Sequence, residues 1–160
     1  MTESRIEARI RELGYELPVA PAPVAAYVPA VISGSYVYTS GQLPFVDGVL
    51  PATGKVSAFG EEGFVNPEDA KKYAGISVLN ALAAVKSVIG NLDRVQRVVK
   101  VVGFVASEVN FTAQPAVING ASELLGEIFG EAGQHARSAV GVPVLPLDSP
   151  VEVEIIVEYV

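Results

Sequence analysis

The run Ala136-Arg137-Ser138-Ala139-Val140-Gly141-Val142 carries the only lysine or arginine that follows Lys100. Its pattern is typical of a strand, and a charge inside an apolar strand is costly to bury unless it is paired. Strand alternation places Arg137 on one face together with Ala139 and Gly141. Because these two neighbours have almost no side chain, we expect open space beside the guanidinium.

Two interpretations of this arginine are compatible with the pattern. A fixed cation that faces open space suits a small carboxylate, which it can hold through two parallel hydrogen bonds. A structural ion pair between Arg137 and a nearby Glu is the alternative, because buried or perturbed charges are often structural.

A second strand-like run, Val151-Glu152-Val153-Glu154-Ile155-Ile156-Val157, follows a stretch bracketed by prolines at 143–150. Alternation puts Glu152 and Glu154 on one face and the apolar side chains on the other. The two glutamates are either the wet face of an edge strand or include a group that handles protons beside a substrate bound to Arg137.

The rest of the chain alternates between helical and strand patterns. Asn66-Pro67-Glu68-Asp69 is a strong helix start, with a cap, a proline at the first position and acids in the first turn. The long stretch 44–66 is rich in turn formers, and a loop of this length is often functional. The expected elements are an N-terminal helix, hairpin strands near 27–32 and 36–40, a helix from 66 to 90, a strand over 94–106, a helix capped by Thr112, and strands near 135–142 and 151–159. This order predicts one α/β (α+β) domain over 1–160, with a sheet and helices packed against it.

The N-terminal segment 1–23 is expected to form a short helix followed by a proline-rich arm. Ser4 and Glu7 make a capping-box pattern, and Ile6, Ile10 and Leu13 repeat at helical spacing. The helix is too short to be stable alone. We therefore expect it to pack on the domain or on a neighbouring subunit.

Composition limits the possible functions. The chain has 160 residues, half of them hydrophobic, a formal net charge of −7 and no cysteine. An acidic surface disfavours general nucleic-acid binding, and Arg94, Arg97 and Lys100 are expected to form a solvated face. The sequence shows neither an uninterrupted apolar membrane span nor an apolar signal core, so a cytoplasmic protein without membrane partners is expected.

Cofactor and metal motifs are missing from the sequence. Gly48 to Lys55 fails as a phosphate-binding loop because the glycine spacing is too long and Val56 replaces the required hydroxyl. His135 is the single histidine, which leaves little material for a zinc site or a catalytic triad, and we expect a structural or site-rim role for it. The predicted site contains neither metal nor cofactor.

Several segments together resemble the RidA/YjgF family of enamine/imine deaminases. The resemblance covers about residues 24–158 and is carried by Tyr38-Thr39-Ser40-Gly41-Gln42-Leu43-Pro44, by Ala136-Arg137-Ser138-Ala139-Val140, and by Leu145-Pro146 through Val151-Glu152-Val153-Glu154. It implies a chorismate-mutase-like fold, a mixed sheet with two main helices on one face, and a homotrimer with clefts between subunits.

The resemblance also implies roles for individual residues. Arg137 matches the arginine that holds the substrate carboxylate, and Glu152 matches the glutamate that positions or activates water. The remaining pocket positions match Tyr27, Ser40, Gly41, Asn119 and the backbone of Ala139. The implied reaction is hydrolysis of a small 2-imino acid, or its enamine form, to a 2-oxo acid and ammonia, without a cofactor.

The chain departs from the short members of this family in three places. Ala139 stands where many members have cysteine, and both the N-terminal segment and the loop at 45–66 are additional. Three other functions stay open at this stage: a small-carboxylate-binding or regulatory trimer without turnover, an endoribonuclease or translation inhibitor, and a purely structural trimer.

Overall fold

The computed structural model describes residues 3–20, 22 and 26–160. Pro21 and Pro23 of the predicted arm lie outside the described residues. The helices and strands are α1 (Arg5–Glu12), β1 (Ala30–Ser33), β2 (Tyr36–Thr39), α2 (Pro67–Ile89), β3 (Val95–Ala106), α3 (Gln114–Phe129), β4 (Ala136–Val142) and β5 (Val151–Tyr159).

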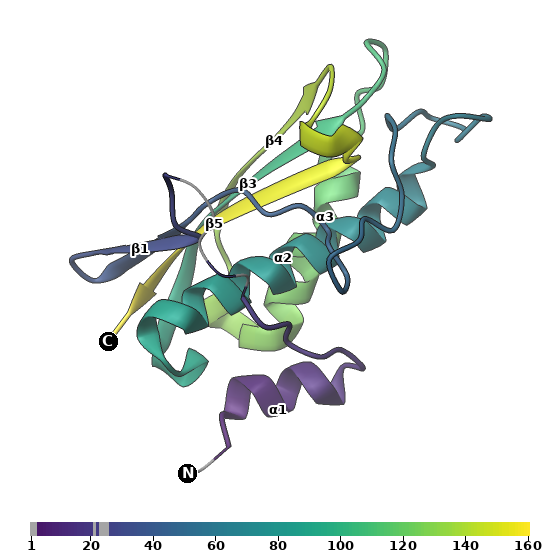
Figure 1. The fold of residues 1–160 in the computed structure, drawn as a ribbon. Coiled ribbons are helices and arrows are strands. Elements are labelled where there is room, and N and C mark those ends of the chain that lie inside the picture. Colours follow the sequence, from purple (N-terminus) through teal and green to yellow (C-terminus); the bar gives the residue numbers. More distant parts are fainter. Residues whose placement is uncertain (1–2, 21, 23–25) are drawn as a thin grey trace.

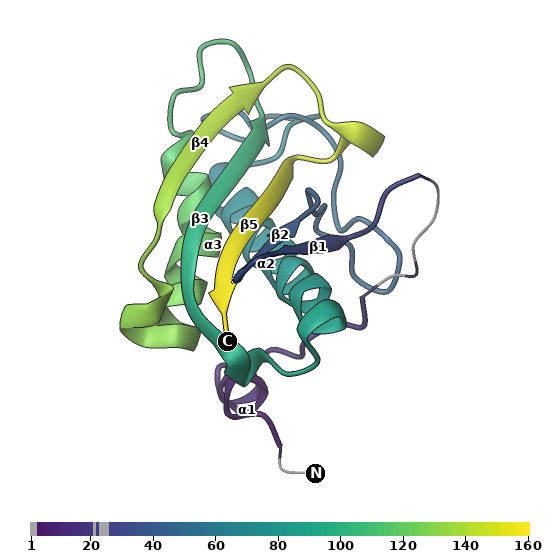
Figure 2. The ribbon, with the colours of Figure 1, turned by 90° about the vertical axis from the view of Figure 1, so that its left-hand side faces the viewer.

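The strands form one five-stranded sheet in the order β1-β2-β5-β3-β4. Only β3 and β4 are parallel, and α3 makes the crossover between them; the other neighbours are antiparallel. Helices α2 and α3 pack on one face of the sheet, and Figure 2 shows the opposite face turned to the viewer without a helix on it. The predicted mixed sheet with two main helices on one face is therefore confirmed.

Helix α2 starts and ends where the sequence predicts. The Asn66 side chain accepts a hydrogen bond from the Asp69 amide at 2.8 Å, and Gly90 closes the helix with φ of 85°. By length and composition α2 is the one helix of the described chain that could cross a membrane, but 61% of its apolar window is buried inside the protein. That burial is the usual property of a central core helix.

Two predicted boundaries are wrong. Helix α3 is capped by Ala113 and not by Thr112, and no side chain caps it. The turn before α3 is held instead by Gln114, whose amide donates to the Phe111 carbonyl at 2.7 Å. Strand β1 begins at Ala30 and not near residue 27, because Pro29 has no amide hydrogen to contribute to a ladder.

The N-terminal helix packs on its own domain, which confirms one of the two predicted arrangements. Ile10 is fully buried. The Asp93 carboxylate accepts hydrogen bonds from the Ser4 hydroxyl at 2.8 Å and from the amides of Arg5 and Ile6 at 3.0 and 2.9 Å. A distant carboxylate thus satisfies the free amides at the start of α1.

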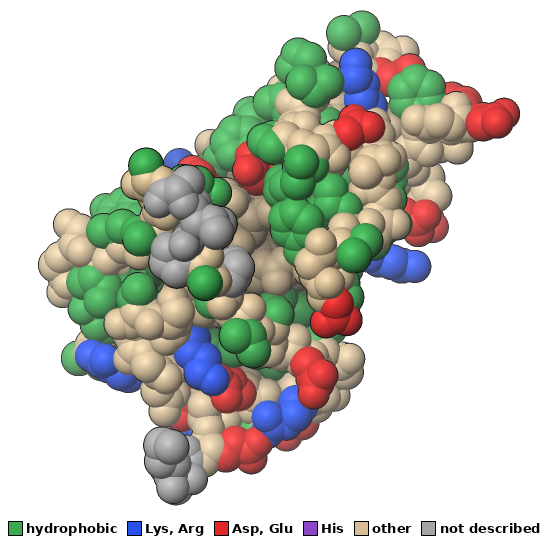
Figure 3. Space-filling view, viewed as in Figure 1, with side chains coloured by type: hydrophobic (Ala, Val, Ile, Leu, Met, Phe, Trp, Pro, Cys, Tyr) green, Lys and Arg blue, Asp and Glu red, His purple; other side chains and the backbone are tan. Residues whose placement is uncertain are grey.

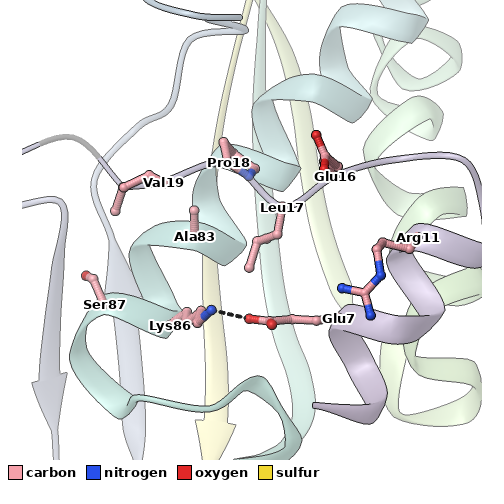
Figure 4. A pocket seen from close by; sticks show the side chains of 10 residues that line it. Glu7, Arg11, Glu16, Leu17, Pro18, Val19, Ala83, Lys86 and Ser87 are labelled. Carbon is pink, nitrogen blue, oxygen red and sulfur yellow. Dashed lines mark ion pairs between the residues drawn. The ribbon is translucent and has the colours of Figure 1, made fainter. Parts of the chain in front are cut away.

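Charged side chains of both signs surround α1 at the bottom of Figure 3, and one ion pair joins Glu7 to Lys86 of α2 (Figure 4). The chain after α1 then runs over α2 and leaves a cleft of about 390 Å³ between them (Figure 4).

Glycines let α3 approach the sheet and α2 closely. A Cβ on Gly103 of β3 would lie 2.5 Å from the Ile118 side chain, and a Cβ on Gly120 would lie 1.8 Å from the Lys71 carbonyl oxygen of α2. Both contacts are too short for any side chain, so only glycine fits. This close packing also brings the residues of α3 that come after Ile118 next to the edge strand β4.

Candidate functional site

Arg137 lies on β4 and reaches across to α3. Its Nη1 donates to Asn119 Oδ1 at 2.8 Å and to Ser122 Oγ at 3.2 Å. Nη1 carries two hydrogens, so these two acceptors match its full capacity. Among the described residues Nε and Nη2 have no hydrogen-bond partner, and the edge of the guanidinium that they form is free.

The ion-pair interpretation of Arg137 is wrong for the part of the chain that the structure describes. Both partners of the guanidinium are neutral, and none of the ion pairs in the described residues includes it. The expected open space is also corrected at one position. A Cβ on Gly141 would lie 2.5 Å from Gln114 Nε2, because the side chain that holds the start of α3 fills that space. The space expected beside Gly141 is therefore filled by Gln114.

Ala139 follows Arg137 on the same face of β4. It pairs with Gly103 of β3 and packs at the border of the hydrophobic core. We call Asn119, Ser122, Arg137 and Ala139 the arginine cluster.

Glu152 gathers a second set of the predicted residues. A Cβ on Gly41 would lie 2.7 Å from Glu152 Oε1, so the carboxyl group covers the bare backbone of Gly41. Ser40 donates through its hydroxyl to the Val28 carbonyl at 2.7 Å, which ties it to the segment that carries Tyr27. The Tyr27 side chain is 66% exposed. We call Tyr27, Ser40, Gly41 and Glu152 the glutamate cluster.

The two clusters lie on opposite faces of the sheet. Arg137 and Ile155 both pair with Val101, and Val101 and Ile155 are buried beneath the helices. Glu152 pairs with Phe104, three residues further along β3, and therefore points to the face without helices. A single copy of the chain thus divides the predicted residues into two groups that cannot meet.

The environment of Glu152 changes its acidity. Burial raises the pKa of the Glu152 carboxyl above its usual value, and the nearby charge of Glu154 adds to the rise. Perturbed carboxyls of this kind are enriched at functional sites. Among the described residues, no group of three or more His, Asp or Glu side chains is placed to hold a metal ion.

Two surface clefts of about 390 and 400 Å³ are lined by neither cluster. The first lies between the N-terminal segment and α2, where Glu7 and Lys86 neutralise each other (Figure 4). The second lies between α2 and α3 and has mixed charge.

The sequence did not single out Ser122, and it assigned His135 only a structural or rim role. In the structure Ser122 Oγ lies 2.8 Å from His135 Nε2 and 3.2 Å from Arg137 Nη1. The spacing along the sequence could have indicated both residues, because each is placed on the same side of its helix or strand run as a predicted site residue. Ser122 follows Asn119 by three residues on one helix, and His135 precedes Arg137 by two residues.

Comparisons with known proteins agree with the fold. A protein-family model described as "YjgF/chorismate mutase-like, putative endoribonuclease" matches residues 7–159. Protein TCP17 of Trypanosoma cruzi is 40% identical over 159 residues, which cover 99% of this chain and 96% of that protein.

Solved structures are also similar. The crystal structure of protein Atu1372 from Agrobacterium tumefaciens has a TM-score of 0.88 and 46% identity, covering 97% of this chain and 92% of that one. The structure of Escherichia coli TdcF with bound serine has a TM-score of 0.60 and 28% identity over 88% of this chain and 94% of that one. The curated sequence of that protein, "Putative reactive intermediate deaminase TdcF", is 34% identical over 139 residues, covering 86% of this chain and 89% of TdcF.

Proposed function

This chain belongs to the YjgF/chorismate-mutase-like family, and from that premise we propose that it hydrolyses small 2-imino acids to 2-oxo acids and ammonia. The proposed site lies between two copies of the chain in a homotrimer. One copy contributes the arginine cluster and its neighbour contributes the glutamate cluster.

The free edge of Arg137 is the observation that carries this proposal. Nη1 is occupied by Asn119 and Ser122, so a ligand meets the guanidinium along Nε and Nη2. Those two nitrogens present parallel N–H groups that match the two oxygens of a carboxylate. A fixed clasp of this kind lowers the orientational cost of bringing water to the imine carbon. The bound serine in the E. coli TdcF structure is a small carboxylate of the same class.

The separation of the two clusters supports a site shared between copies. The face of the sheet that carries Glu152 also carries exposed apolar side chains, which favour contact with another protein surface. They are Val31, Tyr36, Tyr38 and Val140. When this face meets the β4 edge of a second copy, Glu152 of one copy approaches Arg137 of the other. Closed cyclic symmetry then repeats the same site at every interface.

Glu152 performs the proton transfers in this proposal. A raised pKa makes the Glu152 carboxylate a stronger proton acceptor than an ordinary glutamate. The oxygen of a water molecule bonds to the imine carbon while Glu152 takes one of its protons. Glu152 passes this proton to the nitrogen, which gives a carbon that carries one hydroxyl and one amino group. Glu152 then takes the hydroxyl proton and delivers it to the amino nitrogen, so that the carbon–nitrogen bond breaks, the carbonyl of the 2-oxo acid forms and ammonia leaves. The imine carbon is already electrophilic, so water can add to it directly. The reaction is a hydrolysis and changes no oxidation state, so it needs no redox partner.

The endoribonuclease in the family description is disfavoured by the placement of the basic residues. Arg94 donates to the carbonyls of Val160 at 2.7 Å and Ile89 at 2.8 Å, and its guanidinium lies 5.2 Å from the Tyr159 ring centre. The Arg94 guanidinium is therefore held by contacts within the chain, although the residue is exposed. The net charge of −7 opposes a phosphate backbone as well.

Ammonia release tests the activity. An amino-acid oxidase or dehydratase generates 2-iminobutanoate in the assay mixture. The loss of the imine and the release of ammonia are then followed with and without the protein. The wild-type chain should accelerate ammonia release, and Arg137→Ala should abolish the acceleration. Binding of 2-oxobutanoate without any acceleration would instead identify a non-catalytic carboxylate-binding protein, and the proposed hydrolysis would be wrong.

A further inference from the structure

His135, Ser122 and Arg137 form a chain of hydrogen bonds that the proposed reaction does not itself require. His135 Nδ1 lies 2.6 Å from the Gly133 carbonyl oxygen, and its Nε2 lies 2.8 Å from Ser122 Oγ. Ser122 Oγ in turn lies 3.2 Å from Arg137 Nη1. All three side chains are half-buried at the junction of α3 and β4.

The direction of each hydrogen bond follows from the chemistry of the groups. A carbonyl oxygen can only accept, so the Gly133 contact places a proton on His135 Nδ1. In the neutral ring Nε2 then carries a lone pair, which accepts the hydroxyl proton of Ser122. With its proton directed at His135, Ser122 presents an oxygen lone pair to Arg137, which can only donate.

The start of this chain is fixed by the backbone. A Cβ on Gly133 would lie 2.4 Å from the Leu125 carbonyl oxygen, so residue 133 is held tightly against the end of α3. Its carbonyl therefore has a defined position, and the orientation of the histidine ring is defined with it.

We propose that Ser122 and His135 are positioning residues that hold Arg137 with Nη1 turned to the protein and Nε and Nη2 turned to the substrate. This assignment rests on the proposed function, because it concerns how the carboxylate clasp is oriented. Asn119 alone supplies a single acceptor, about which the guanidinium can still rotate. The second acceptor, Ser122, fixes its plane, and His135 keeps the serine proton from competing with the arginine.

The single histidine of the chain makes the proton arrangement directly measurable. Nitrogen NMR of the ¹⁵N-labelled ring in the full-length protein at neutral pH should show Nδ1 protonated and Nε2 unprotonated. In Ser122→Ala the Nε2 signal should shift, because its hydrogen-bond donor is lost. A ring protonated at Nε2 in the wild-type protein would overturn the proposal.

Binding of 2-oxobutanoate measures the consequence for Arg137. Ser122→Ala should raise its Kd about 10-fold, and His135→Leu about 5-fold, since each removes one hydrogen bond of the chain. His135→Gln should remain within about 2-fold of wild type, because the Gln oxygen can still accept the serine proton. Ser87→Ala is the matched control: this α2 serine also uses its hydroxyl group in a hydrogen bond, to the Ala84 carbonyl at 2.6 Å, and lies in neither cluster.

The outcomes separate this proposal from the proposed function. Wild-type protein that does not bind 2-oxobutanoate would overturn the carboxylate site and this assignment with it. Wild-type binding with equal affinity in Ser122→Ala, His135→Leu and the Ser87→Ala control would overturn this assignment alone. A loss of affinity in His135→Leu that His135→Gln does not rescue would assign His135 a packing role and also contradict the proposal.

Discussion

Gly41→Ala should displace the Glu152 carboxyl group while leaving the fold intact. The backbone of Gly41 has no positive φ, so alanine adopts it without strain. The added Cβ would lie 2.7 Å from Oε1, 2.8 Å from Cδ and 3.0 Å from Cγ of Glu152. The three nearest atoms thus all belong to one side chain, which can move.

The structure gives the size of the displacement. Ordinary van der Waals contact begins near 3.4 Å, so the carboxyl group must move by about 0.7 Å. A misplacement of about 1 Å costs up to about 10²-fold in rate, and we therefore expect kcat/KM for imine hydrolysis to fall about 30- to 100-fold. The free energy of unfolding should change by less than about 1 kcal/mol, because a half-buried side chain can move and alanine lowers the entropy of the unfolded chain.

The assay compares kcat/KM for 2-iminobutanoate with the melting temperature of the same samples. Gly126→Ala on α3 is the matched control, because nothing lies within 4 Å of its Cβ position. In a Glu152→Gln background Gly41→Ala should add almost no further loss, as expected for two changes that act on one group. Full activity in a stable Gly41→Ala protein would refute the role given to the position of Glu152.

Three further predictions concern the clasp, the pH response and the N-terminal helix. Arg137→Lys should fail to restore the binding of 2-oxobutanoate lost in Arg137→Ala, because one ammonium cannot form a planar two-point clasp; an unchanged Kd in calorimetry would contradict this. Burial and then Glu154 raise the pKa of Glu152, so Glu152 favours the fold below its unfolded pKa and loses that contribution as pH rises through its folded pKa. Glu152→Gln should therefore be at least as stable as wild type at neutral pH and lose any advantage in acid, and chemical denaturation at both pH values measures it; a less stable variant at neutral pH would be the opposite result. Ile10→Ala should cost about 2–4 kcal/mol of unfolding free energy, because Ile10 is fully buried, whereas Val19→Ala, at a 94% exposed position, should cost almost nothing; equal melting temperatures for the two would contradict the docking of α1.

The order of the elements was predictable because its signals are local. Asn66 and Pro67 mark the start of α2, Gly90 marks its end, and both boundaries agree with the structure within a residue. The start of α3 was not predictable from Thr112, because the side chain of Gln114 holds that turn through its own contacts.

The sequence predicts the candidate site only as a set of residues. Alternation along each strand shows that Arg137 and Ala139 share a face and that Glu152 and Glu154 share a face. It does not show which face of the sheet each pair occupies, since that depends on the register of both strands against β3. The capping of α1 by Asp93 is equally invisible to local patterns, because it joins residues about 90 positions apart.

The measurement that tests the shared site most directly is the activity of a protein assembled from two inactive variants. Arg137→Ala and Glu152→Gln chains are co-expressed with different tags, and trimers that contain both are purified. In a ring of three that contains both chains, one interface of the three combines an intact Arg137 from one copy with an intact Glu152 from the other, so about one third of wild-type ammonia release should return. Mixed trimers as inactive as either parent, or a wild-type chain that is monomeric and fully active, would contradict a site formed by two copies.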